Sequence, residues 1–338
     1  MCTYFGTLSN GETAMKYTIK NNTLTAELTD LGATLVKLWV PDKDGNLADV
    51  VLGHDDVQLY AAGGGFAGAT VGRNANRVRG AGFDMNGEYV KLHDNENANN
   101  LHSGPDTWRA RVWQVTKQTE NSITFRLDSP HGDQGFPGNA VVSVTYALEA
   151  PATLRISYDA VSDRDTVFNL TNHSYFNLAG HEKQELAMEQ TLAMPARFFN
   201  PDDAANIPTG ELRSVEGTPM DFRKPKALNR DIHEDYEPLH LQAGYDHNFE
   251  VWCNPCAILR DPSSGRTMAV STDCPGIQVY TANFLADPGK DGVEYKIRCG
   301  VALETQFYPD SVNHPEWPQP FVKAGQKYHS ETSFAFSW

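Results

Sequence analysis

The chain has 338 residues, of which 40% are hydrophobic and 21% are charged, a composition typical of a folded globular protein. Its 43 Asp and Glu residues outnumber its 28 Lys and Arg residues, so the formal net charge is -15. A surface with this balance repels phosphate backbones and anionic lipids. We therefore expect neither a nucleic-acid partner nor a membrane partner.

Residues 1–32 lack the charged segment and apolar run of a secretory leader. No apolar stretch approaches the roughly 20 residues that cross a bilayer. Five cysteines are few and odd in number for a chain of this length, which favours free thiols in a reducing compartment. The CxxC at 253–256 lacks a second pair of zinc ligands, so buried thiols are expected there. These features predict a cytoplasmic protein.

Strand patterns begin near the N-terminus, where residues 24–28 alternate with period two and residues 31–40 form an extended apolar run. Asn86-Gly87 lies between the short runs 83–85 and 88–90, and this dipeptide is typical of a tight hairpin turn. Further strands are expected at 113–117 and 122–127, 141–148 and 154–161, 257–260 and 267–271, and 301–308 and 328–336.

Glycine (27) and proline (19) interrupt the chain throughout, so no amphipathic helix of three or more turns is expected. Residues 181–248 contain six prolines and predict long loops with short strands laid over the sheets. No repeat of roughly 20 to 50 residues suggests a propeller. Many short strands with turn signals predict an all-β, antiparallel sandwich or barrel, and we expect residues 1–338 to form a single domain.

Residues 63–68, GGGFAG, satisfy the glycine pattern of dinucleotide-binding loops. That pattern has meaning only between a strand and the start of a helix, where backbone amides hold a pyrophosphate. Residues 69–73, which follow, predict no helix. We therefore expect no nucleotide at this segment.

The segment 168–180, FNLTNHSYFNLAG, has apolar residues at the even positions 168, 170, 176 and 178 and polar or aromatic residues at the odd positions 169–177, a strand pattern that is interrupted in its middle. The even positions predict a face that packs on the core. The odd positions carry His173, and the residues alone leave two interpretations of this face open. It is either the solvated side of an ordinary sheet or the floor of a site.

Three more stretches place polar or ionisable residues where sheet packing does not require them, namely VGRNANRV at 71–78, NNLHSG at 99–104 and ALETQF at 302–307. In the last, Val301, Leu303 and Phe307 share one face, so Glu304 and Gln306 must point to the other. Taken singly, a loop histidine or a strand glutamate is most often exposed. Residue types and periodicity therefore indicate an all-β protein with candidate acid–base residues, and no more.

Six segments in order resemble the successive signatures of the aldose 1-epimerase (galactose mutarotase) family: GRNANRV, NNLHSG, LTNHSYFNLAG, GYDHNF, CPGIQVYTANFL and ALETQFYPDSVNHPEWP. The similarity runs from about Leu31 to Phe336, nearly the whole chain. It implies a large antiparallel β-sandwich, the galactose mutarotase-like supersandwich, with few short helices. It also implies a cleft that holds a free aldohexose such as galactose or glucose without metal or cofactor, in a monomer or homodimer.

The resemblance implies roles for individual residues. His173 matches the position of the family's general acid and Glu304 that of its general base. Positions that hold sugar hydroxyls or support this pair are matched by Asn76, Arg77, His102, Asp246 and Gln278.

Three details are open at this level. Asp246 could instead stabilise a turn after Gly244-Tyr245, and Tyr175 or Phe284 could either stack on the sugar or belong to the core. Arg73-Asn74 replaces a common Arg-Tyr or Arg-Val, which leaves one wall of the pocket, and with it the sugar preference, open.

The residue types also suit the chemistry of anomer interconversion. One proton must leave the C1 hydroxyl and another must reach the ring oxygen, after which the open chain rotates about C1–C2 and recloses. A carboxylate that is ionised at neutral pH can accept the first proton, and a histidine held protonated beside it can donate the second. Each positioned group contributes roughly 10² to 10⁴-fold, so the reaction does not require a metal.

Other functions of the same fold are open on these residues. A hexose-phosphate 1-epimerase would need a cationic pocket, which the acidic balance does not favour. A non-catalytic sugar-binding protein would keep the cleft without turnover, and the presence of both His173 and Glu304 weighs against it. A glycosidase would use a second carboxylate in place of the histidine.

Overall fold

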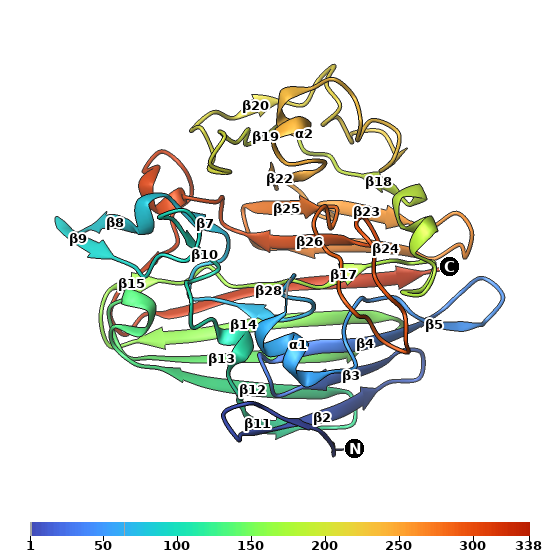
Figure 1. Cartoon of the computed structure of the whole chain (residues 1–338), viewed down its shortest axis with the longest axis horizontal. Coiled ribbons are helices and arrows are strands. Elements are labelled where there is room, and N and C mark those ends of the chain that lie inside the picture. The colour runs from blue at the N-terminus through green and yellow to red at the C-terminus, as the bar shows by residue number, and fades with distance from the viewer. Residues whose placement is uncertain (1, 64) are drawn as a thin grey trace.

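The computed structural model describes residues 2–63 and 65–338, and antiparallel sheets dominate it (Figure 1). The largest sheet has nine strands. Their spatial order is β11 (Gln114–Gln118), β12 (Ser122–Ser129), β13 (Ala140–Glu149), β14 (Thr153–Ser162), β28 (Lys327–Ser337), β24 (Thr267–Thr272), β23 (Ala257–Arg260), β18 (Thr191–Ala193) and β21 (Lys226–Ala227).

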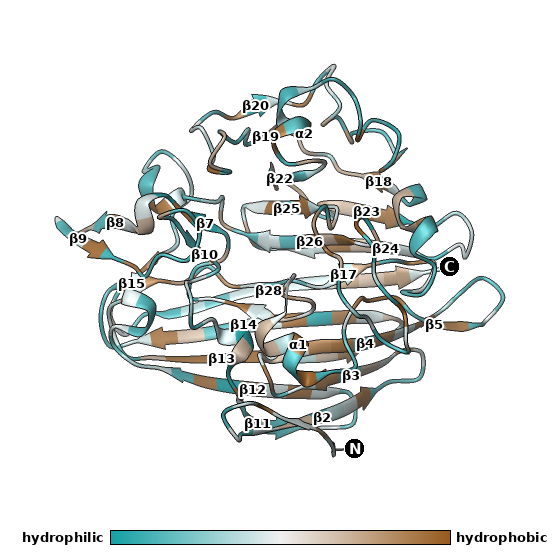
Figure 2. Cartoon of the chain, viewed as in Figure 1, coloured by the Kyte–Doolittle hydropathy of each residue, from teal (hydrophilic) through white to brown (hydrophobic). Residues whose placement is uncertain are grey.

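The N-terminal part of the chain forms a five-stranded antiparallel meander. Its strands are β1 (Cys2–Thr7), β2 (Thr13–Lys20), β3 (Thr25–Thr29), β4 (Thr34–Pro41) and β5 (Leu47–Asp49). The meander packs on the nine-stranded sheet, since Leu28 and Leu38 belong to the same buried cluster as Val144 and Ile156. Buried residues alternate with half-buried or exposed ones along β13 and β14, as expected of strands that cover a core with one face. Figure 2 shows the hydropathy of the residues along these strands.

A six-stranded sheet carries most of the candidate site. Its spatial order is β17 (Tyr175–Phe176), β26 (Val301–Gln306), β25 (Gly276–Tyr280), β22 (Asp246–Glu250), β19 (Phe198–Phe199) and β20 (Arg213–Ser214). All six residues of β26 are buried, because its Leu303 face packs in the main core while its Glu304 face lies under loops.

Short two-stranded ladders complete the fold. They pair β7 (Arg77–Val78) with β10 (Asn100–Leu101), β6 (Thr70–Val71) with β16 (Thr171–Asn172), β8 (Gly82–Met85) with β9 (Glu88–Lys91), and β15 (Thr166–Val167) with β27 (Phe321–Val322). Asn86 and Gly87 join β8 to β9 with φ values of 55° and 84°. Two positive φ values in succession define the hairpin turn that this dipeptide predicts.

The helices of the described residues are short. They are α1 (Val57–Ala62) and α2 (Glu237–Leu241), with 3₁₀ turns η1 (Arg79–Ala81), η2 (Trp108–Ala110), η3 (Asp133–Gly135), η4 (Gln184–Glu189) and η5 (Ser311–Asn313). This confirms the expected lack of long helices. Within the described residues, none of them has the length and apolar character that a membrane crossing needs.

The predicted all-β sandwich is confirmed, and the predicted strand pairs are present with bounds shifted by a few residues. Residues 181–248 form short strands, α2 and loops, and most of this segment lies along the top of the molecule in yellow (Figure 1). The five cysteines are free thiols; of the CxxC pair, Cys256 is buried as expected, whereas Cys253 is only half-buried.

Candidate active site

A cavity of about 200 Å³ opens on the six-stranded sheet and contains most of the predicted site residues. Of the seven, six line it: Asn76, Arg77, His102, His173, Asp246 and Glu304. Gln278 does not line it but donates a hydrogen bond from Nε2 to Asp246 Oδ1 at 2.8 Å. The residues that the sequence singled out from distant segments therefore meet in one place.

Strand register explains how His173 and Glu304 come together. Tyr175 pairs with Ala302 across β17 and β26, and the chain before Tyr175 continues alongside β26 in the opposite direction. His173 therefore lies opposite Glu304, and the two side chains point to the same side because each is two residues from that pair. His173 Nε2 is 3.5 Å from Glu304 Oε1.

Both members of the pair are buried, with His173 5% and Glu304 2% exposed. The solvated interpretation of the odd face of residues 168–180 is therefore wrong, because loops cover that face. Burial lowers the pKa of His173 to about 4, and the Arg109 cation acts in the same direction. Burial also raises the pKa of Glu304 well above its usual range, and the Asp246 carboxylate adds to this effect.

These shifts change the expected distribution of protons between His173 and Glu304. The sequence predicted a protonated imidazole beside an ionised carboxylate. Burial disfavours both charges, so the lowered pKa of His173 favours the neutral imidazole and the raised pKa of Glu304 shifts the balance toward a protonated carboxyl.

His102 is held by two contacts with Asn76 at the end of the β7–β10 ladder. The His102 amide donates to the Asn76 carbonyl at 3.1 Å, and the Asn76 amide donates to His102 Nδ1 at 3.2 Å. Because Nδ1 accepts, the neutral ring carries its hydrogen on Nε2. Both residues have positive φ, 62° for Asn76 and 52° for His102, a geometry that turns the chain at the cavity wall. His102 thus presents a hydrogen-bond donor.

Arg77 and Asp246 form the charged side of the cavity. The Arg77 guanidinium makes a bidentate pair with Glu96, with Nε–Oε2 at 2.6 Å and Nη2–Oε1 at 2.9 Å. Burial raises the pKa of Asp246, while Arg77 and the Gln278 amide oppose that rise. Asp246 heads β22 and its side chain lines the cavity, so the alternative of a turn-stabilising aspartate does not describe it.

Several buried polar atoms around the pair lack a partner among the described residues. They include His173 Nδ1, Glu304 Oε2 and Gln278 Oε1. Buried polar atoms are normally hydrogen-bonded. Unpaired atoms at a cavity are therefore ready to bind the hydroxyl groups of a ligand.

His102, His173 and Glu304 also offer ligand atoms within 4.8 Å of one another, a spacing that a metal ion could bridge. Their surroundings do not fit a metal site. A metal-bound histidine normally donates its second ring N–H to an acceptor. His173 Nδ1 has no partner, and His102 Nδ1 accepts a hydrogen bond from an amide. The trio is better suited to exchanging hydrogen bonds and protons with a polyol.

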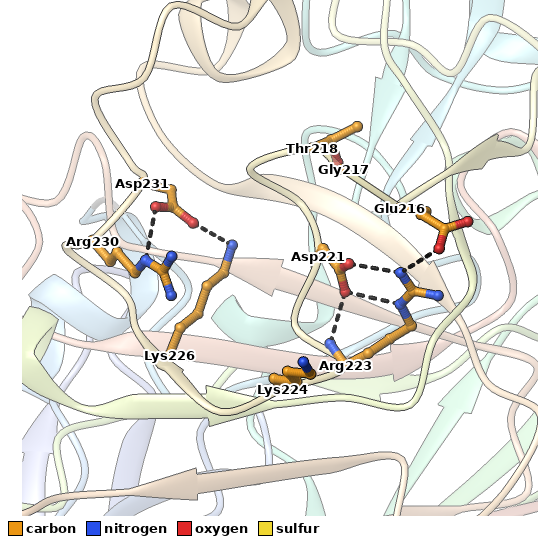
Figure 3. A pocket seen from close by; sticks show the side chains of 9 residues that line it. All are labelled: Glu216, Gly217, Thr218, Asp221, Arg223, Lys224, Lys226, Arg230 and Asp231. Atoms are coloured by element: carbon orange, nitrogen blue, oxygen red, sulfur yellow. Dashed lines mark hydrogen bonds and ion pairs between the residues drawn. The ribbon is translucent and has the colours of Figure 1, made fainter.

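A larger cavity, of about 620 Å³, lies elsewhere and is lined by residues of 216–231. Its carboxylates are engaged by its cations: Asp221 and Glu216 bind Arg223, and Asp231 binds Lys226 (Figure 3). None of the predicted site residues lines it. The smaller cavity is therefore the candidate active site.

Comparison with known proteins identifies the family of the chain. The family model for aldose 1-epimerase matches residues 15–335. The chain belongs to the aldose 1-epimerase family. It is 40% identical to the aldose 1-epimerase of Haemophilus influenzae over 326 residues, which is 94% of each chain. It is 38% identical to the galactose mutarotase of Bos taurus, covering 98% of this chain and 97% of that one.

Solved structures of aldose 1-epimerase relatives have the same fold. An aldose epimerase homologue from C. elegans superposes with a TM-score of 0.89 at 31% identity, covering 96% of this chain and 99% of that chain. A galactose 1-epimerase from Lactobacillus acidophilus superposes with a TM-score of 0.87 at 26% identity, covering 100% and 98%. The predicted membership and supersandwich fold are confirmed.

Some cavity residues of this family member were not predicted. Phe66 comes from the glycine-rich segment 63–68, which the sequence marked only as a false nucleotide motif. Tyr280 ends β25, and Asn206 and Gln242 come from the irregular segment between β18 and β22. No periodicity marks such loop residues, so only the fold reveals them. Both candidate stacking residues line the cavity, but Tyr175 is buried whereas Phe284 is 69% exposed.

Proposed function

We propose that the protein interconverts the α and β anomers of free aldoses such as galactose and glucose by general acid–base catalysis. Glu304 would act as the base and His173 as the acid. One observation carries the proposal: the two side chains, from distant segments, face each other at 3.5 Å in a cavity that admits a monosaccharide. Membership of the aldose 1-epimerase family supports the reaction type.

Sugar binding would prepare the pair for catalysis. A sugar hydroxyl donating to the unpaired Glu304 Oε2 stabilises the carboxylate form, because a hydrogen bond to a charged group favours that form. The proton of the pair then moves to His173, which donates it to the ring oxygen while Glu304 accepts the C1 hydroxyl proton. After rotation about C1–C2 the two groups exchange roles and the ring recloses.

The other predicted residues would hold the sugar and the open chain. His102 Nε2–H and Arg77 Nη1, which Glu96 leaves unbound, can donate to sugar oxygens, and Asp246, fixed by Gln278, can accept from hydroxyls. Asn76 would act both as a hydrogen-bonding wall and as the anchor of His102. Exposed Phe284 can stack on the apolar face of the ring, while Tyr175 is part of a core cluster and serves as a rigid wall.

The composition of the cavity favours a neutral sugar over a sugar phosphate. Arg77 is the one guanidinium or ammonium group among its described lining residues, and Glu96 already occupies two of its nitrogens. A phosphate binds best to several cations or to a free bidentate arginine. Hexose-phosphate epimerisation is therefore the less favoured alternative.

We also propose that the protein acts in the cytoplasm, as a monomer or homodimer, on a free small-molecule sugar. Five free thiols support a reducing compartment. The strongly negative net charge supports the lack of nucleic-acid and membrane partners. Analytical ultracentrifugation would give the oligomeric state.

Polarimetry of freshly dissolved α-D-galactose and α-D-glucose tests the proposed activity. Added protein should speed the change of rotation well beyond the buffer-catalysed rate, in proportion to enzyme concentration. Binding of galactose by calorimetry without any such acceleration would instead favour a sugar-binding protein. Comparison with galactose 6-phosphate as substrate and inhibitor separates the phosphate-specific alternative.

A further inference from the structure

Phe66, in the glycine-rich stretch that the sequence singled out, packs its ring against the imidazoles of His173 and His102. The Phe66 ring is nearly parallel to the His173 ring, with 6.1 Å between centroids and 25° between planes. The same phenyl ring is 4.7 Å from the His102 ring. Phe66 therefore forms the wall of the cavity that both imidazoles face.

Backbone contacts fix this segment next to His173. The Gly68 amide donates to the His173 carbonyl at 2.9 Å, and the His173 amide donates to the Ala69 carbonyl at 3.0 Å. Gly68 has a φ of 69°, and a Cβ there would lie 2.1 Å from the Leu35 carbonyl oxygen. Glycine is thus required at position 68 for this close approach.

Arg109, at the η2 turn, lies against the ring of Phe66. Its guanidinium carbon is 4.0 Å from the Phe66 ring centroid, a close cation–π contact. Its Nη1 donates to the Gly63 carbonyl at 2.7 Å, so the same side chain binds both the ring and the backbone of the segment. Arg109 does not line the cavity and is not placed to touch a sugar there.

The backbone of Arg109 is itself fixed. A Cβ at Gly32 would lie 2.8 Å from both the Arg109 Cα and its carbonyl oxygen, so the two backbones are in close contact. The Gly32 amide also donates to the Arg111 carbonyl at 2.8 Å. These contacts with Gly32, which lies between β3 and β4, fix the backbone from which the Arg109 side chain extends.

From this stack of guanidinium, phenyl and imidazole we propose that Arg109 is a positioning residue, acting through Phe66 on the acid His173. Arg109 holds the phenyl ring over the imidazole and adds a fixed positive charge within about 10 Å of it. This inference rests on the proposed function, because it assigns a purpose to a residue that supports the acid of that reaction.

The charge has a definite chemical consequence. A nearby cation disfavours the imidazolium form, so His173 gives up its proton to the ring oxygen more readily once it has received it. The other groups that face the imidazole are Glu304 on β26, His102 beyond β10, Tyr175 on β17 and Tyr280 on β25. Of these and Arg109, only the arginine is a permanent cation.

The test compares Arg109→Met, Arg109→Gln and Arg109→Lys with the wild type in the pH profile of kcat/KM for galactose. Removal of the charge by Met or Gln should move the midpoint of the acid limb upward by roughly 0.3 to 1 pH unit. Lys retains the charge and should leave the midpoint nearly unchanged, while its lost planar stacking lowers kcat. Arg126→Met, on the remote strand β12, is the matched control and should match the wild type.

A second readout does not depend on turnover. NMR titration of the His173 imidazole, assigned by its loss in His173→Gln, should show the same upward shift in Arg109→Gln. If wild type accelerates mutarotation but both readouts are unchanged by Met and Gln, the proposed role of Arg109 is wrong. If wild type lacks activity, the proposed function fails, while the titration still decides whether Arg109 acts on His173.

Discussion

At the scale of single residues, His173 and Glu304 differ from exposed histidines and glutamates mainly because they are buried. The imidazole loses affinity for its proton and the carboxyl gains affinity for its own, so their protonation ranges move past each other. Groups coupled at 3.5 Å titrate as a pair, and the form with one proton is the useful one. Burial therefore sets the pH range in which the pair can work.

The pH dependence of kcat/KM follows from these directions. A second proton enters the pair only as the pH falls through about 4, and the single proton leaves as the pH rises through the raised pKa of Glu304. We expect kcat/KM for galactose to change little between pH 7 and pH 5.5. An imidazole with an ordinary pKa near 6.5 would instead produce a fall of roughly eightfold, and such a fall would contradict the account.

His247 on β22 should make stability depend on pH. It is fully buried, and burial lowers its pKa to about 3. As the pH falls from 7 to 5, this residue is protonated in the unfolded chain but stays neutral in the folded chain. The free energy of unfolding therefore falls by about 2 kcal/mol. His247→Gln should lose that much less stability over this interval, measured by urea unfolding at both pH values.

His329 provides a control of opposite sign. It is exposed and paired with Asp159, which raises its pKa, so its contribution is present at low pH and is lost as the pH rises. His329→Gln should therefore enlarge the loss between pH 7 and pH 5. If the two variants respond alike, the buried state of His247 is not the cause.

At the scale of elements, strands with one buried face are the part of the fold that the sequence predicts well. Alternation along residues 141–148 and 154–161 yields β13 and β14 nearly in full. The segment 168–180 is different, because it forms two short strands that pair with different partners, β6 and β26. Periodicity identifies its two faces but not this division, which depends on distant strands.

The site itself could be predicted only through the resemblance. His173 and Glu304 meet because of the register of the segment 168–180 along β26, and no local pattern in either segment specifies that register. Phe66 and Asn206 project from loops, where side-chain direction depends on the surrounding fold. The residue types thus indicate candidate site residues, and the pairing of distant strands determines which of them come together.

The segment between β25 and β26 is held to the N-terminal sheet by a buried ion pair. Lys290 is 0% exposed and donates to Asp49 Oδ2 at 2.5 Å and to the carbonyls of Val36 and Val51 at 2.7 Å. All three of its hydrogens are therefore bound. Because this segment also carries Phe284, the ion pair contributes to the position of the cavity rim.

Asp49→Asn leaves a buried ammonium without its carboxylate and should destabilise the fold by about 3 to 5 kcal/mol. The double variant with Lys290→Met should lose less than the sum of the single losses, since both changes remove one interaction. Equilibrium unfolding in urea measures this. Lys37→Met, whose partner Asp291 is exposed, is the control and should cost no more than about 1 kcal/mol. Additive losses would show that the ion pair is not coupled.

At the scale of the whole molecule, one buried cluster links residues from Ile19 in β2 to Phe336 in β28, and it includes strands from all three large sheets. A shared core favours cooperative unfolding. We propose that the chain is a single domain, as this shared core indicates. The candidate site depends on this arrangement, because its walls come from the six-stranded sheet and from loops of the N-terminal half.

This proposal predicts one unfolding transition along the whole chain. Far-ultraviolet circular dichroism and tryptophan fluorescence should change together in urea, because Trp108 and Trp113 lie in the shared core while Trp252 is at the surface near β22. A transition independent of protein concentration would indicate a monomer, and a concentration-dependent one would indicate a homodimer. Two separate transitions would contradict a single domain.

The most direct test of the acid and base roles uses the variants Glu304→Gln and His173→Gln. Their rates of α-to-β galactose interconversion are measured together with their affinity for galactose on the same samples. Each variant should lose at least about 10²-fold in kcat while still binding galactose, and exposed Glu120→Gln should keep full activity. Turnover at the wild-type rate by either pair variant would contradict the assignment of acid and base.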